Sequence, residues 1–166
     1  MSKEYLGFKK DSPEVRELVK WWRGLDEDRG ERAILRRSHN LLDVAFSPAY
    51  HRLRLAVGHF GDVDDDRLAL IVGLAARVKS EDNSGSIAEQ MATGKPDGSA
   101  RVTGLRFRRM LKIKDREELF TAMTRIIALL GGSANIQSLA QSVYFWNDIT
   151  RKQWAFDYYS KGPNEV

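Results

Sequence analysis

Residues 67–78, RLALIVGLAARV, carry apolar side chains at the spacing of a helix. The residues at i, i+3, i+4 and i+7 share one helical face, and Leu70 and Leu74 widen it. A helix with so broad an apolar face is expected at the centre of a hydrophobic core, around which the rest of the chain packs. The residues that define the stripe are Leu68, Ile71, Val72 and Ala75.

Helix start signals divide the sequence before this segment. Ser12-Pro13 and Ser47-Pro48 each place a capping hydroxyl before a proline that suits the first helical position. Between them, residues 31–42, ERAILRRSHNLL, are predicted to form a further helix. The acidic residues 62–66, DVDDD, are interpreted as a cap and as compensation of the helix dipole.

The sequence after the central segment continues the helical pattern. A short helix is predicted at residues 87–91. Asp115 begins a segment that resembles a capping box and continues as a regular apolar stripe. Ser133 and Asp148 are the predicted caps of the last two helices.

These segments predict an all-α protein, a compact bundle of about eight or nine helices arranged as two lobes. No stretch alternates in polarity for long enough to make a convincing strand. The strongest turn signal, GKPDGS at residues 94–99, marks the predicted boundary. The lobes comprise residues 1–95 and 96–166, which are expected to form one structural unit.

The charge distribution favours an acidic partner. The net charge is +4, and residues 1–95 hold 16 basic and 16 acidic side chains, whereas residues 96–166 hold 11 and 7. A basic surplus of this kind suits a nucleic acid or an acidic protein surface.

The composition also excludes several classes of protein. The absence of cysteine excludes disulfides, thiolate nucleophiles and cysteine-ligated metal sites. The start of the chain lacks the apolar core of a signal peptide, and no run approaches the roughly 18 apolar residues of a membrane helix. We therefore expect a cytoplasmic protein with no membrane partner.

The most basic stretch is residues 101–114, RVTGLRFRRMLKIK, which combines six basic and six apolar residues with no acid. An amphipathic basic helix is the simplest interpretation, with apolar residues such as Val102 and Leu105 anchored in the core. Such a helix either meets a polyanion or only solvates the surface with its arginine side chains. The stretch alone leaves both open.

A second basic group lies in the segment around residues 29–37, where Arg29, Arg32 and Arg36 share a stripe. Like charges at this spacing repel by a few tenths of a kcal/mol each, so they need acidic neighbours or an external anion. Asp28 and Glu31 are close enough in sequence to supply the first.

Signals for catalysis are weak. The three histidines do not have the i, i+4 spacing of a zinc site, and the phosphate loops GxxxxGK[ST] and GxGxxG do not occur. Asp64 and Asp66 could hold magnesium for a nuclease, but they are adjacent in sequence instead of converging from separate elements. We therefore expect a protein that is not an enzyme and that binds neither a metal ion nor a cofactor. The histidines are His39, His51 and His59.

The tryptophans have two possible roles. They could stack on single-stranded bases, but their helical spacing with other apolar residues favours core packing. The four residues are Trp21, Trp22, Trp146 and Trp154.

Three segments occur in order along the chain: WRGL at residues 22–25 followed by GERAILRR at 30–37, RFRRML at 106–111, and WAFDYY at 154–159. In an all-α, cysteine-free chain of this length, the combination resembles the small subunit of the type I-E CRISPR surveillance complex Cascade, the CasB family. The resemblance implies a non-enzymatic helical protein, present as two copies in a ribonucleoprotein that carries a guide RNA.

The resemblance also implies partners. These would be the guide RNA, the target and displaced DNA, the other Cascade subunits and a second copy of the chain. Basic surfaces would hold the backbone while base pairing reads the sequence. The alternative is a helical protein-protein adaptor whose basic face meets acidic neighbours, with no direct role in nucleic-acid binding.

Carried over to this chain, the resemblance predicts phosphate contacts for six arginines, with Lys112 and Arg125 as weaker candidates. Arginine suits this task because its planar guanidinium binds phosphate oxygens bidentately and stays charged. The six are Arg32, Arg36, Arg37, Arg106, Arg108 and Arg109.

Overall fold

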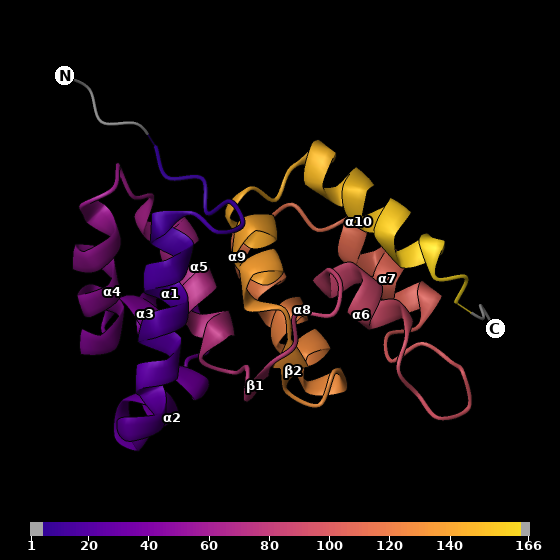
Figure 1. The fold of residues 1–166 in the computed structure, drawn as a ribbon, viewed down its shortest axis with the longest axis horizontal. Coiled ribbons are helices and arrows are strands. Elements are labelled where there is room, and N and C mark those ends of the chain that lie inside the picture. Colours follow the sequence, from indigo (N-terminus) through magenta and orange to yellow (C-terminus); the bar gives the residue numbers. More distant parts are fainter. Residues whose placement is uncertain (1–4, 164–166) are drawn as a thin grey trace.

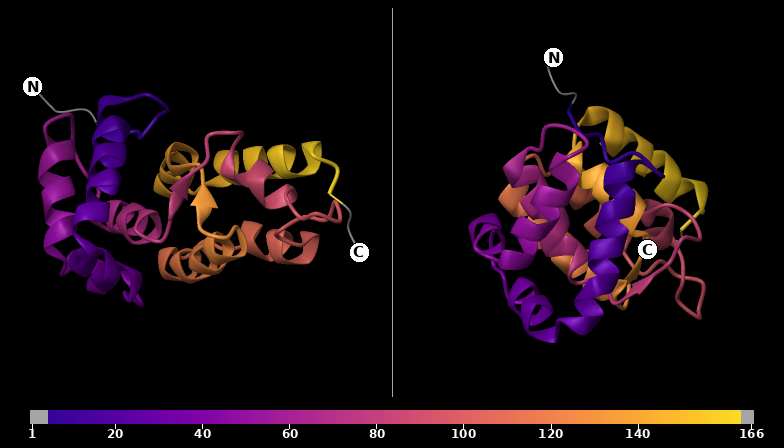
Figure 2. Two further views of the ribbon diagram at one scale, coloured as in Figure 1. Left: turned by 60° about the horizontal axis from the view of Figure 1, so that its bottom comes forward. Right: turned by 60° about the vertical axis from the view of Figure 1, so that its left-hand side comes forward.

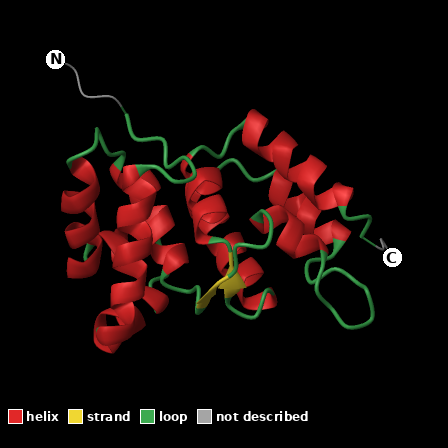
Figure 3. Cartoon of the chain, viewed as in Figure 1, coloured by secondary structure: helices red, strands yellow, loops and turns green. Residues whose placement is uncertain are grey.

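The computed structural model describes residues 5–163, which are helical apart from loops and two short strands (Figure 1, Figure 3). Within this range ten α-helices and one turn of 3-10 helix confirm the all-α prediction. The first half contains α1 (Pro13–Gly24), η1 (Leu25–Glu27), α2 (Arg29–Arg36), α3 (Leu41–Ala45), α4 (Pro48–Gly58) and α5 (Asp65–Ala75). The second half contains β1 (Ser80–Glu81), α6 (Ile87–Ala92), α7 (Gly104–Leu111), α8 (Arg116–Leu129), β2 (Ser133–Ala134), α9 (Ile136–Tyr144) and α10 (Asp148–Ser160).

The helices are arranged along one long axis. Helices α1 to α5 lie toward one end, α6, α7 and α10 toward the other, and α8 and α9 between them (Figure 1, Figure 2). One cluster of buried hydrophobic side chains extends through both ends, from Leu6 to Tyr158. Of the helices in residues 5–163, none is both long enough and apolar enough to cross a membrane.

The division into lobes at residues 94–99 stays a prediction. Helix α6 precedes this turn, but it packs against α10, which follows it. The Ser86 hydroxyl, at the start of α6, donates a 3.0 Å hydrogen bond to the Asp157 carboxylate of α10. These contacts join the two sides of the turn.

Helix α5 is the centre of the core, as residues 67–78 predict. Every residue from Leu68 to Ala75 is buried, and α3, α8 and α9 all pack on this helix. Gly73 allows α8 to approach closely, because a Cβ atom at this position would lie 2.5 Å from Cε2 of Phe120 and 3.0 Å from Cγ2 of Val44.

The predicted caps at Ser12, Ser47 and Asp115 are confirmed, and Asp64 is the cap within the acidic residues 62–66. The side chains of Ser12, Ser47, Asp64 and Asp115 accept hydrogen bonds from backbone N–H groups in the first turns of α1, α4, α5 and α8. A capping residue acts within a few positions of itself, so the local sequence is enough to find it.

Two predicted caps are wrong, because each helix begins elsewhere than predicted. Ser133 lies in β2, which pairs in parallel with β1, and Asn135 caps α9. Asp148 is the first residue of α10, and Asn147 before it is the cap. Asparagine caps a helix about as well as serine or aspartate, so the residue type does not select between neighbours.

Residues 31–42 are two helices instead of the one predicted, since α2 ends at Arg36 and α3 begins at Leu41. The guanidinium of Arg77 donates hydrogen bonds to three carbonyl oxygens between residues 35 and 38. The carbonyls at the end of α2 are therefore satisfied by a cation from outside the helix.

A buried carboxylate holds the start of the described chain. Glu14 is 7% exposed, and its Oε2 accepts hydrogen bonds from the backbone N–H groups of Gly7 at 3.1 Å and Phe8 at 3.3 Å. The buried ring of Phe8 packs on Tyr144, with ring centroids 4.7 Å apart. Burial acts to raise the pKa of Glu14, but hydrogen bonds from Ser12 and from the N–H groups of Glu14, Gly7 and Phe8 outweigh it, and the pKa is lowered.

The close approach at Gly73 gives a stability prediction. Gly73→Ala should lower the free energy of unfolding by about 1–3 kcal/mol, because overpacking exceeds the gain of helix propensity. Gly30→Ala in α2 is the control, since nothing lies within 4 Å of a Cβ atom there. Denaturant unfolding followed by circular dichroism measures both, and equal effects would contradict the proposed contact with Phe120.

The Glu14 contacts predict a pH dependence. Glu14→Gln should lower the free energy of unfolding at neutral pH by about 1–3 kcal/mol, because a charged acceptor is lost. The folded-state pKa lies below the ordinary value of 4.5, so the stabilisation is fully present above pH 4.5 and is lost as the pH falls through the folded-state pKa. Unfolding of the wild type and the variant over a pH series should therefore converge in acid. A constant difference would be evidence against the assignment.

Candidate nucleic-acid interface

Helix α7 is fixed to the core through one face. The Thr103 hydroxyl caps it, and Gly104, Phe107 and Met110 are buried. The ring of Phe107 stacks on that of Tyr158 in α10, with centroids 4.0 Å apart and planes 7° apart. These contacts hold the helix in one orientation, so its opposite face points outward. The helix is shorter than the basic stretch at residues 101–114.

The outward face of α7 is basic. Arg106, Arg108 and Arg109 are exposed, and Lys112 is exposed directly after the helix. Leu105 was expected as a core anchor, but its side chain is 54% exposed among the arginines. Two residues along a helix correspond to about 200°, so Leu105 and the buried Phe107 point in opposite directions. We call the exposed side chains of residues 105, 106, 108, 109 and 112 the α7 basic face.

The α2 arginines have intramolecular contacts. Nη1 of Arg32 lies 2.7 Å from Oδ1 of Asp26, and Nε of Arg36 donates a 2.7 Å hydrogen bond to the carbonyl of Ala76. Burial lowers the pKa of Arg36, and the positive charge of Arg32 adds to this effect. Arg37, which follows the helix, is exposed.

An acidic neighbour thus pairs with an α2 arginine, but it is neither of the two residues expected from the sequence, Asp28 and Glu31. Asp28 and Glu31 lie beside Arg52 of α4, at 3.8 and 3.3 Å. Asp26 of the preceding turn pairs with Arg32 instead.

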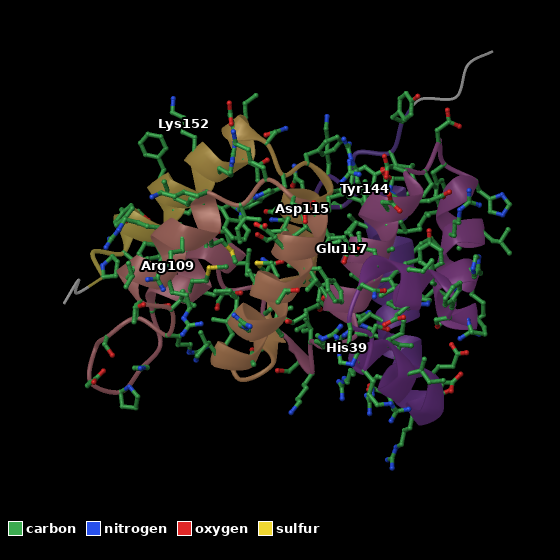
Figure 4. All side chains as sticks on the ribbon, turned by 180° about the vertical axis from the view of Figure 1, so that it is seen from behind. His39, Arg109, Asp115, Glu117, Tyr144 and Lys152 are labelled. Atoms are coloured by element: carbon green, nitrogen blue, oxygen red, sulfur yellow. The ribbon has the colours of Figure 1, made fainter. Side chains whose placement is uncertain are left out.

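The two basic groups do not form one local site. Helix α2 lies toward one end of the molecule and α7 toward the other (Figure 1). Figure 4 shows the same separation from behind, with Arg109 near one end and His39, just after α2, toward the other. Arg125 is exposed on α8, which lies between them.

Sequence reasoning missed Arg77, whose guanidinium donates four hydrogen bonds to backbone carbonyls. Its Nη1 donates to the carbonyls of Gly73 at 2.6 Å and Leu35 at 3.3 Å, and its Nη2 to those of Arg36 at 3.1 Å and Ser38 at 2.7 Å. Burial lowers the pKa of Arg77, and the charge of Arg36 adds to this effect. A basic residue just after an apolar helix, where carbonyls are unpaired, was the available signal.

Two of the acidic residues in the stretch 62–66 have structural roles. Asp64 caps α5, as interpreted, and Asp65 forms an ion pair with Arg54, with Oδ1 2.7 Å from Nε. No group of three or more histidine, aspartate or glutamate side chains in residues 5–163 is placed to hold a metal ion. His51 Nε2 lies 2.7 Å from the carbonyl oxygen of Ala45.

A groove of about 460 Å³ opens beside these acids, between α5, α8 and α9. Asp115, Glu117 and Tyr144 mark it in Figure 4. Three basic and three acidic residues line it, so it offers no net charge to an anion. Glu117 is already engaged, since its carboxylate accepts a hydrogen bond from the backbone N–H of Leu41 at the start of α3.

The tryptophans pack in or against the core, as predicted. Each indole N–H donates a hydrogen bond within the protein, to the carbonyl of Ala49, Val78 or Ile113 or to the hydroxyl of Ser142. The indole side chains are therefore part of the fold, and the arginines are the candidates for nucleic-acid binding.

Comparison with known proteins identifies the family. The sequence model of the family of CRISPR-associated protein Cse2 matches residues 31–159. The chain therefore belongs to this family. No curated protein gives a significant match.

Solved structures show the same fold. CasB from Thermus thermophilus aligns with a TM-score of 0.63 and 23% identity over 90% of this chain and 99% of that chain. A second structure from Thermus thermophilus, of a CRISPR-associated protein of the Cse2 family, aligns with a TM-score of 0.61 and 25% identity. The alignment covers 90% of this chain and 99% of that chain. A chain in the structure of E. coli Cascade bound to a PAM-containing double-stranded DNA target aligns with a TM-score of 0.63 and 17% identity. The alignment covers 86% of this chain and 94% of that chain.

The contacts of Arg77 give a stability prediction. Arg77→Lys should lower the free energy of unfolding by about 1–3 kcal/mol, because one ammonium group cannot replace a planar fork that contacts four carbonyls. Denaturant unfolding is the measurement, with Arg37→Lys as the exposed control. Equal stability of the two variants would show that the four hydrogen bonds do not hold α2 to α5.

Proposed function

We propose that this protein is a non-catalytic subunit of a type I-E Cascade complex and that it binds nucleic-acid backbone through the α7 basic face. It assembles with a guide RNA, the other subunits and a second copy of itself in the cytoplasm. Its contacts with the guide-target region and the displaced DNA strand stabilise the opened duplex. Membership of the Cse2 family supports the proposal, as does the fold shared with a chain of E. coli Cascade bound to double-stranded DNA.

The burial pattern of α7 is the observation that carries the proposal. The helix buries a face with no charge, at Gly104, Phe107 and Met110, and exposes arginines on the rest of its surface. Residues 98–114 contain no acid that could neutralise these charges locally. Arginines on a rigid helix can contact phosphates in any sequence, as expected where base pairing selects the target.

The α2 group makes a smaller contribution in this proposal. Arg37 is exposed, whereas Arg32 and Arg36 already contact Asp26 and the carbonyl of Ala76. A phosphate near α2 would compete with these intramolecular contacts, which lowers the free energy gained by binding there.

Charge reversal on α7 tests the proposal. Arg109→Glu should weaken binding of single-stranded DNA by the isolated chain. The slope of the logarithm of the association constant against the logarithm of the salt concentration, which is negative, should become shallower by about one. Fluorescence anisotropy at several salt concentrations measures both, and circular dichroism checks that helical content is unchanged. Arg106→Glu should behave alike.

Arg16→Glu is the matched control, because it makes the same change of charge on an exposed position of α1. Loss of binding in Arg109→Glu alone supports a contact at α7. Equal loss in both variants indicates only a general effect of net charge. A flat salt response in the wild type overturns the proposal and favours the protein-protein adaptor.

A further inference from the structure

A second surface, distinct from the α7 basic face, is a groove of about 780 Å³ between α9, α10 and the loop at residues 83–86. On α10 it is lined by Ile149, Gln153 and Asp157, which follow one another at intervals of four. Arg151 and Tyr158, which contact the α7 region, lie on average about 140–160° around the helix from them. Helix α10 therefore separates the groove from α7.

The lining of the groove is mostly neutral and polar. Amide and hydroxyl side chains form most of it, and an amide can donate and accept hydrogen bonds at once. The amide residues are Asn83, Asn135, Gln137, Gln141 and Gln153, and the hydroxyl residues are Ser86, Ser138, Ser142 and Thr150.

Internal hydrogen bonds make the walls rigid. Asn135 Nδ2 donates to the carbonyl of Gly85 at 2.8 Å, and Gln153 Nε2 donates to Oδ1 of Asp157 at 2.8 Å. The indole N–H of Trp154 donates to the Ser142 hydroxyl at 2.9 Å. A preformed polar wall lowers the entropy cost of binding a ligand.

Other polar groups stay available to a ligand. The Gln141 side chain is exposed on α9. Its side-chain amide group has no hydrogen-bond partner within residues 5–163. Ile149 adds an apolar contact at the edge, with 81% of its surface exposed.

The charges of the groove argue against a phosphate ligand. Its ionisable residues are Lys10, Asp11 and Asp157, which sum to a net charge of −1. Asp157 is held by Ser86 and Gln153 and faces the groove as a carboxylate. A nucleic-acid strand would bring further negative charge to this surface, whereas a peptide main chain brings none. Each peptide unit presents one N–H donor and one C=O acceptor, which match the amides of the lining.

We infer that this groove binds an extended peptide segment of another subunit of the complex, with Ile149 contacting an apolar side chain of that segment. The inference rests on the proposed assembly of the chain with other subunits. It does not rest on nucleic-acid contacts at α7.

Hydrogen exchange in the assembled complex tests this inference in two steps. The complex of the chain, its sibling subunits and the guide RNA is compared with the isolated chain, first without target DNA and then with it. Assembly without DNA should slow exchange of the amides at residues 82–86 and 148–150 by at least about tenfold.

A variant supplies the second arm. Gln141→Trp fills the groove without removing an internal hydrogen bond of the Gln141 side chain. It should abolish this protection and weaken incorporation into the complex by about tenfold or more, with binding of single-stranded DNA by the isolated chain unchanged. Lys20→Trp on an exposed position of α1 is the control and should incorporate like the wild type.

Two results at the groove would overturn this inference by itself. Absence of protection at both steps shows an unoccupied groove, and protection that appears only with DNA shows a nucleic-acid occupant. Failure at α7 is a separate result, because it is read from Arg109→Glu in the anisotropy assay. If the wild-type chain does not co-migrate with the sibling subunits, the assembly itself is wrong, and both proposals fall together.

Discussion

Burial of α5 on all sides from Leu68 to Ala75 is the constraint on which the rest of the structure depends. A helix that is apolar all round has to be enclosed, so α3, α8 and α9 pack on it and turn their polar faces outward. Gly73 sets the distance of α8, since the ring of Phe120 occupies the space of the missing side chain. The positions of α7 and α10 follow from that packing through the continuous core.

The same enclosure divides the arginines into two kinds. Arg77 leaves the end of α5 and uses its guanidinium to bind four carbonyls, which makes it part of the fold. The α7 arginines surround a helix whose uncharged face is fixed by Phe107 against Tyr158. One group is held inside by hydrogen bonds, and the other is directed toward solvent. Positive charge is thus concentrated where the backbone is rigid, as a phosphate-binding surface requires.

Much of the fold could be predicted from the sequence, because its signals are local. The central helix follows from its periodicity, and the caps at Ser12 and Ser47 act within one turn. The parallel pairing of β1 with β2 could not be found, because two-residue strands leave no periodic pattern. The site residues were predicted from charge clustering and the family resemblance, neither of which shows the contacts of a side chain. Whether an arginine has a partner depends on distant elements, as for Arg36 and the carbonyl of Ala76, and the groove beside α10 is assembled from four separate segments.

Cross-linking at position 105 tests the central claim most directly. Leu105 is exposed in the middle of the α7 basic face, and its replacement by a photoreactive benzoylphenylalanine keeps an apolar side chain there. Irradiation of the assembled complex with radiolabelled guide RNA and target DNA should transfer label to this chain. Label that is absent from position 105, but present when the same residue is placed at exposed position 16 of α1, would contradict the account.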